Sequence, residues 1–67
     1  MTLYNVYFFS YFMEQVGKNV PASEIANYGR IIDTIWYHDK PCGYFMANRQ
    51  KMYFAIDVTV PQNPFVY

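Results

Sequence analysis

This 67-residue sequence has one cysteine, Cys42, and three glycines that are far apart from one another. A single thiol cannot form a disulfide within the chain, and a free thiol is typical of a reducing compartment, so we expect a cytoplasmic protein. Isolated glycines do not form the glycine-rich loops that hold nucleotide phosphates. No apolar run reaches the roughly 20 residues of a membrane-spanning helix. The aromatic run over residues 3–13 lacks the basic start of a signal peptide, so we expect no membrane partner.

Charge is also scarce, with five Lys or Arg and five Asp or Glu, which gives a formal net charge of zero. Among the basic residues, only Arg49 and Lys51 are close together in the sequence. Binding to a phosphate backbone requires clustered cations, so the sequence predicts no nucleic-acid partner. The alternative is base stacking on Tyr44, Phe45 and Tyr53 beside these two cations.

Reactive side chains gather only at His38, Asp39 and Cys42. A histidine can activate a cysteine thiolate, with a carboxylate orienting the imidazole. These three residues crowd one turn, however, and no oxyanion hole or phosphate loop accompanies them. Adding Asp33 gives no paired Cys/His spacing of the kind that structural zinc sites use. We therefore predict that the protein is not an enzyme and holds no metal or other cofactor.

Aromatic residues are what the sequence has in excess: eight Tyr, six Phe and one Trp. Such side chains carry large apolar areas, and tyrosine adds a polar tip that suits both cores and contact surfaces. A domain of about 60 residues has a small interior and marginal stability. We therefore expect the chain to be one domain over residues 1–67, with some of its rings facing a partner.

The clearest secondary-structure pattern is a strict alternation over residues 52–60, ended by Pro61. The apolar side chains occupy the even positions: Met52, Phe54, Ile56, Val58 and Val60. Period two with β-branched and aromatic residues predicts a half-buried strand. Residues 43–47 are predicted to form its partner strand, with residues 48–51 as the hairpin loop.

Upstream, Pro21 and Glu24 suit the first turn of a helix. The apolar residues that follow at helical spacing predict a helix over residues 22–37: Ile25, Tyr28, Ile32, Ile35 and Trp36. Residues 3–12 favour a strand followed by a short irregular or helical piece, and a helix there is the alternative. The predicted fold is thus α+β, a small mostly antiparallel sheet in β-α-β-β order with one helix packed across it.

Residues 61–67 form a proline-flanked tail that ends in apolar side chains. The tail could anchor in a groove on another subunit or protein, or it could fold back on its own core, and the sequence leaves both open. Tyr, Trp and Arg are enriched at interface hot spots. The predicted partner contacts are Tyr44, Arg49, Tyr53, Phe65 and Tyr67.

These features favour a small protein-binding regulator that acts without turnover. The specific hypothesis is an inhibitor encoded by a phage or mobile element, which occludes a host or defence protein in the host cytoplasm. It rests on the size of the chain and on its lack of a catalytic set. The alternative is a structural subunit whose aromatic face is buried in a homo-oligomer.

Overall fold

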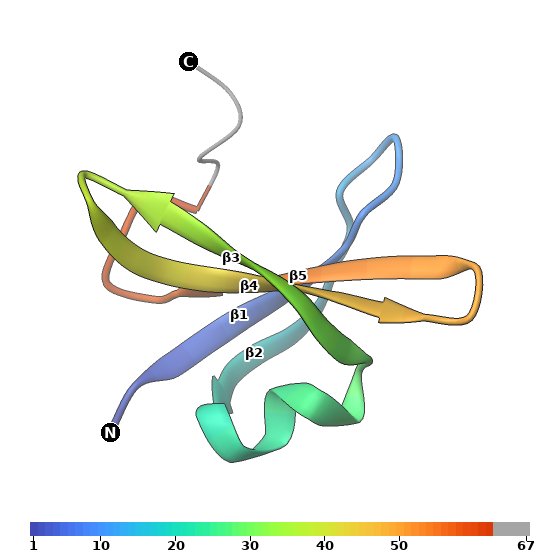
Figure 1. The fold of residues 1–67 in the computed structure, drawn as a ribbon, viewed down its shortest axis with the longest axis horizontal. Helices are drawn as coiled ribbons and strands as arrows, with labels where there is room; N and C mark the ends of the chain where they lie inside the picture. The colour runs from blue at the N-terminus through green and yellow to red at the C-terminus, as the bar shows by residue number, and fades with distance from the viewer. Residues whose placement is uncertain (63–67) are drawn as a thin grey trace.

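The computed structural model describes residues 1–62, which form one antiparallel β-sheet of five strands and a short 3-10 helix. The elements are β1 (Leu3–Phe8), β2 (Gln15–Pro21), η1 (Ala22–Asn27), β3 (Arg30–Tyr37), β4 (Lys40–Asn48) and β5 (Lys51–Asp57). The strand order in the sheet is β2-β1-β5-β4-β3, so β1 lies between β2 and β5. Figure 1 shows a strongly twisted sheet in which β3 crosses in front of its neighbours.

The predicted α+β fold with a helix packed across the sheet is wrong, and so is the β-α-β-β order. Residues 22–27 form only the short η1, and residues 30–37 form β3. This segment contains Ile31, Ile32, Thr34 and Ile35, whose branched Cβ atoms favour strands. The apolar spacing of this segment also fits a helix, but the segment pairs with β4 and is therefore a strand. A local sequence pattern does not reveal such pairing.

Strand β2 replaces the short irregular or helical piece expected after the first strand. It is an edge strand, and most of its side chains are exposed. It therefore lacks the apolar alternation that would have revealed it. The strand interpretation of the first segment is confirmed, although β1 ends at Phe8 and does not extend to residue 12.

The predicted hairpin is confirmed. Strands β4 and β5 pair from Gly43↔Ile56 to Asn48↔Lys51 around a two-residue loop. Strand β5 ends at Asp57, earlier than expected, because Asp57 starts a turn. Its carboxylate accepts hydrogen bonds from the backbone N–H and the hydroxyl of Thr59, and its carbonyl accepts one from the N–H of Val60.

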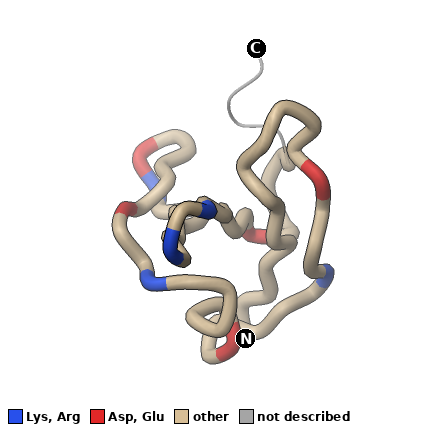
Figure 2. Tube along the Cα trace, turned by 90° about the vertical axis from the view of Figure 1, so that its right-hand side faces the viewer, with Lys and Arg blue, Asp and Glu red and all other residues tan. Residues whose placement is uncertain are grey.

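Both faces of the sheet bury apolar side chains, whereas the sequence pattern indicated one. The first core cluster contains Tyr4, Val6, Val20, Ile25, Met46 and Ala55. The second contains Ile35, Cys42, Phe54 and Ile56. Residues 54–56 of β5 contribute to both clusters, so this strand is the centre of the interior. Among residues 1–62 no charged side chain is buried, and Figure 2 shows acidic and basic residues interspersed along the trace.

Tyr4 couples the stability of this interior to pH. Its ring centroid lies 5.9 Å from that of Tyr44. Burial, followed by the interaction with Tyr44, raises the pKa of Tyr4 from 10.0 to about 12. The folded protein therefore keeps this phenolic proton over a pH range in which the unfolded chain loses it.

We expect Tyr4 to give the free energy of unfolding no pH dependence below about pH 10 and to lower it between about pH 10 and 12, by about 3 kcal/mol at most. Denaturant titrations over this range measure the slope. Tyr4→Phe should unfold with a shallower dependence on pH. An unchanged slope in Tyr4→Phe would assign the alkaline loss to other groups, such as Tyr7, whose pKa burial also raises.

Candidate binding surfaces

An apolar surface lies along the edge strand β3. Ile31 and Ile32 are each 45% exposed and Trp36 is 62% exposed. Phe9 and Met52 are also partly exposed. Phe9, Ile32 and Met52 line one hollow, whereas Ile31 and Trp36 lie elsewhere along the strand; we call these five exposed side chains the β3 surface. Large apolar side chains that gather at a sheet edge are a feature of contact surfaces.

The pairing of β3 with β4 has two irregularities along this stretch. The register shifts between Ile31 and Asp33 and again between Ile35 and Trp36. Each shift is a β-bulge or a similar irregularity, which locally re-aims side chains on the affected strand. Ile35, between the two shifts, is buried in the second core cluster. Ile32, at the first shift, and Trp36, just after the second, are exposed.

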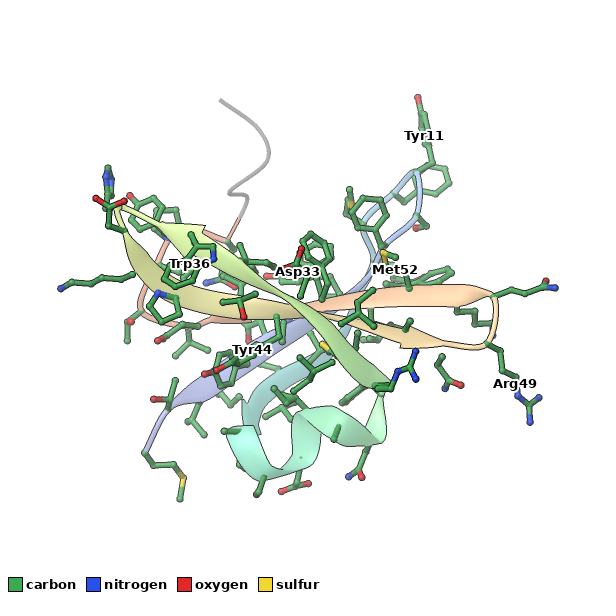
Figure 3. The ribbon with its side chains drawn as sticks, viewed as in Figure 1. Tyr11, Asp33, Trp36, Tyr44, Arg49 and Met52 are labelled. Carbon is green, nitrogen blue, oxygen red and sulfur yellow. The ribbon has the colours of Figure 1, made fainter. Side chains whose placement is uncertain are left out.

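Part of the β3 surface lines a hollow. A depression of about 250 Å³ is lined by Phe9, Ile32, Asp33, Phe45 and Met52. Figure 3 labels Asp33 and Met52, which both line this hollow. The hollow therefore offers a mostly apolar site with one carboxylate at its wall.

On each edge strand a side chain occupies one backbone N–H, and the pairing with the inner neighbour is irregular. On β3, the Asp33 carboxylate accepts a hydrogen bond of 2.8 Å from the N–H of Thr34. On β2, the Asn5 side-chain oxygen accepts one of 3.3 Å from the N–H of Asn19, and the pairing with β1 is irregular. Bulges and blocked donors are common means of preventing edge-to-edge association. The register shifts therefore make both edges less regular templates for another strand.

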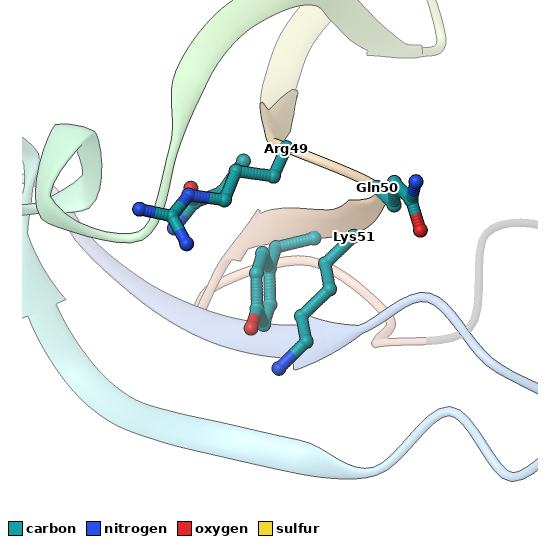
Figure 4. Close-up of a pocket in the computed structure, with 5 residues that line it drawn as sticks. Arg49, Gln50 and Lys51 are labelled. Atoms are coloured by element: carbon teal, nitrogen blue, oxygen red, sulfur yellow. The ribbon is translucent and has the colours of Figure 1, made fainter.

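The turn of the β4–β5 hairpin contains a second candidate site. A hollow of about 530 Å³ is lined by Asn48, Arg49, Gln50, Lys51 and Tyr53 (Figure 4). Two predicted contact residues, Arg49 and Tyr53, are therefore brought together here. Arg49 has φ of 59°, so the turn holds it in a left-handed conformation. The Tyr53 ring packs on Phe8 and Tyr28 beneath the hollow, at centroid distances of 5.4 and 6.1 Å.

The other predicted contacts do not join this hollow. Tyr44 is half-buried and packs against the first core cluster. Phe65 and Tyr67 lie outside the described residues. Trp36, which the sequence pattern assigned to a buried helical stripe, is instead a prominent part of the β3 surface. Reading residues 30–37 as a strand, from their β-branched content, would have identified it.

The three reactive residues His38, Asp39 and Cys42 differ in burial. His38 and Asp39 form the exposed β3–β4 turn, with φ of 50° and 63°, whereas Cys42 is buried. A hollow of about 400 Å³ near this turn includes His38, Cys42 and Asp57 in its lining. Burial raises the pKa of the Cys42 thiol, which disfavours the thiolate that a nucleophile requires. Within residues 1–62, no three His, Cys, Asp or Glu side chains gather as metal ligands.

The described part of the chain has no helix of the length and apolarity needed to cross a membrane. Comparisons with protein-family models, curated proteins and solved structures found no match. The surfaces themselves are therefore the basis for assigning a function.

Proposed function

We propose that this protein binds another protein through the β3 surface and acts by occupying its partner, without turnover. The observation that carries the proposal is the exposure of Ile31, Ile32 and Trp36 on one edge strand. Exposed apolar side chains concentrated on one strand, beside a mostly apolar hollow, are typical of a surface that a partner covers. Tryptophan is also among the residues most enriched at interface hot spots.

Such a module inhibits its partner when the covered surface is one that the partner needs. An inhibitor encoded by a phage or mobile element and acting in the host cytoplasm is the specific form of this proposal. The small size of the chain and the raised pKa of its one thiol support binding over catalysis. The homo-oligomer is the second candidate. The irregular pairing of the edge strands favours packing of two β3 surfaces over strand pairing in such an assembly.

Trp36 is the sole tryptophan, so its fluorescence reports directly on the β3 surface. We expect ligands selected from a displayed peptide library against the immobilised protein to shift Trp36 emission to shorter wavelength and to protect it from a soluble quencher. The double variant Ile31→Ser/Ile32→Ser keeps Trp36 as the probe and removes apolar side-chain area that a bound ligand would bury. It should weaken these ligands by about tenfold or more.

Phe12→Ser is the matched control, because Phe12 is 84% exposed in the β1–β2 loop and is not part of the β3 surface. Binding that is lost in Phe12→Ser but kept in the double variant would contradict the proposal. Sedimentation over a concentration series tests the second candidate. Self-association that shields Trp36 and is lost in the double variant would identify the β3 surface as a homo-oligomer interface.

A further inference from the structure

Three basic side chains gather at the end of the sheet where the β4–β5 hairpin turns. Strand pairing places Arg30 opposite Ala47, close to the turn that contains Arg49. A hollow of about 560 Å³ is lined by Ala26, Asn27, Gly29, Arg30, Ala47, Asn48 and Arg49. It shares Asn48 and Arg49 with the hollow that contains Lys51 and Tyr53. The fold thus brings Arg30 to a hollow that Arg49 also lines, although these two residues are far apart in the sequence.

The lining of these two hollows is rich in hydrogen-bond donors. Besides the three cations it includes the side-chain amides of Asn27, Asn48 and Gln50 and the hydroxyl of Tyr53. Neither hollow has an Asp or Glu in its lining. Figure 3 shows Arg49 extending outward from the end of the hairpin, where a ligand can reach it. The combined site, which we call the cationic hollow, is complementary to an anion.

We propose that the cationic hollow binds an acidic segment, rich in Asp or Glu, of the same partner protein that covers the β3 surface. This inference rests on the proposed function. Strand pairing places Arg30 of β3 and Met52 of β5 on either side of Ala47, so a cation of the hollow and a side chain of the β3 surface lie in one row across the sheet. One partner can therefore place apolar side chains on the β3 surface and carboxylates in the cationic hollow. Arginine forks bind carboxylates with two parallel hydrogen bonds.

The geometry favours carboxylates over single-stranded nucleic acid. Nucleic-acid sites of that kind combine a cationic groove with aromatic rings on which successive bases stack. The lining of the cationic hollow includes one ring, Tyr53, which is half-buried against Phe8 and Tyr28. Its charges gather near one turn and do not form a line along which a nucleic-acid backbone could run.

Fluorescence anisotropy of a labelled oligoglutamate peptide tests this inference without the natural partner. We expect binding at low salt that weakens as salt is added. The double variant Arg49→Asn/Lys51→Gln should weaken it by about tenfold or more. Asparagine is chosen at position 49 because it tolerates the left-handed conformation of that residue. Adding Arg30→Gln should weaken binding further.

Lys40→Gln is the matched control for Lys51→Gln as a single change, because it removes one positive charge at the other hairpin, where Lys40 begins β4. Equal weakening by Lys40→Gln would show non-specific attraction and overturn the inference. So would tighter binding of a single-stranded oligonucleotide of matched charge, which would identify a nucleic-acid site. If oligoglutamate fails to bind while library ligands still cover Trp36, the inference fails and the proposed function stands. The reverse result would reject the proposed function and leave an anion site alone.

Discussion

Gly43→Ala is expected to prevent the sheet from forming. A Cβ atom at this position would overlap the backbone carbonyl oxygen of Ala55 on the neighbouring strand. Gly43 is paired with Ile35 on β3 and with Ile56 on β5, so β4 cannot move away without disrupting pairing on both sides. We expect a loss of more than about 4 kcal/mol in the free energy of unfolding. A chain of this size has only about 3–10 kcal/mol in total.

Circular dichroism and thermal melting at neutral pH measure this effect. The matched control is Gly17→Ala, whose Cβ would lie 2.6 Å from the Tyr28 hydroxyl oxygen. That contact is with the far end of a side chain, which can rotate away, so Gly17→Ala should fold with a much smaller loss. Cooperative melting of Gly43→Ala near the wild-type temperature would show that β4 and β5 are not as close as described.

Phe54→Ala should also remove most of the stability. Phe54 is only 2% exposed, and its ring stacks on Tyr7 at a centroid distance of 5.0 Å. Phe9 and Phe45 contact it at 5.9 and 6.2 Å. Truncation leaves a cavity that the surrounding rings cannot fill completely. Such substitutions lower the free energy of unfolding by about 3–5 kcal/mol. Denaturant titration should give a midpoint far below that of the wild type.

Phe12→Ala changes the same residue type in the same way at an exposed position. It should alter the free energy of unfolding by no more than about 0.5 kcal/mol. The contrast between the two variants separates burial from aromatic content. Similar losses in both variants would contradict the assignment of Phe54 to the core and of Phe12 to the surface.

Local patterns predicted the β4–β5 hairpin because its alternation and its loop lie within one short stretch of sequence. Non-local pairing explains most of the errors. Residues 30–37 have apolar side chains at a spacing that also fits a helix, and only β4 makes them a strand. Strand β2 is held by β1 and has little apolar pattern of its own.

The same distinction applies to the candidate sites. Arg49 and Tyr53 line one hollow because they lie near one turn, which the sequence could reveal. Arg30 joins them only through the β3–β4 pairing, so cations that are far apart in the sequence become neighbours. Trp36 was assigned to the core because the helical interpretation of residues 22–37 turned it inward.

The position of β1 between β2 and β5 has a consequence for the order of folding during synthesis. Strand β1 can pair with β2 early, but its other partner, β5, is the last strand among residues 1–62. Until residues 53–57 leave the ribosome, one side of β1 has no strand to pair with. Closing such a distant pair is slow compared with forming a hairpin. We therefore expect β3, β4 and β5 to assemble as a unit and then to dock onto a waiting β1–β2 pair, the step that completes both core clusters.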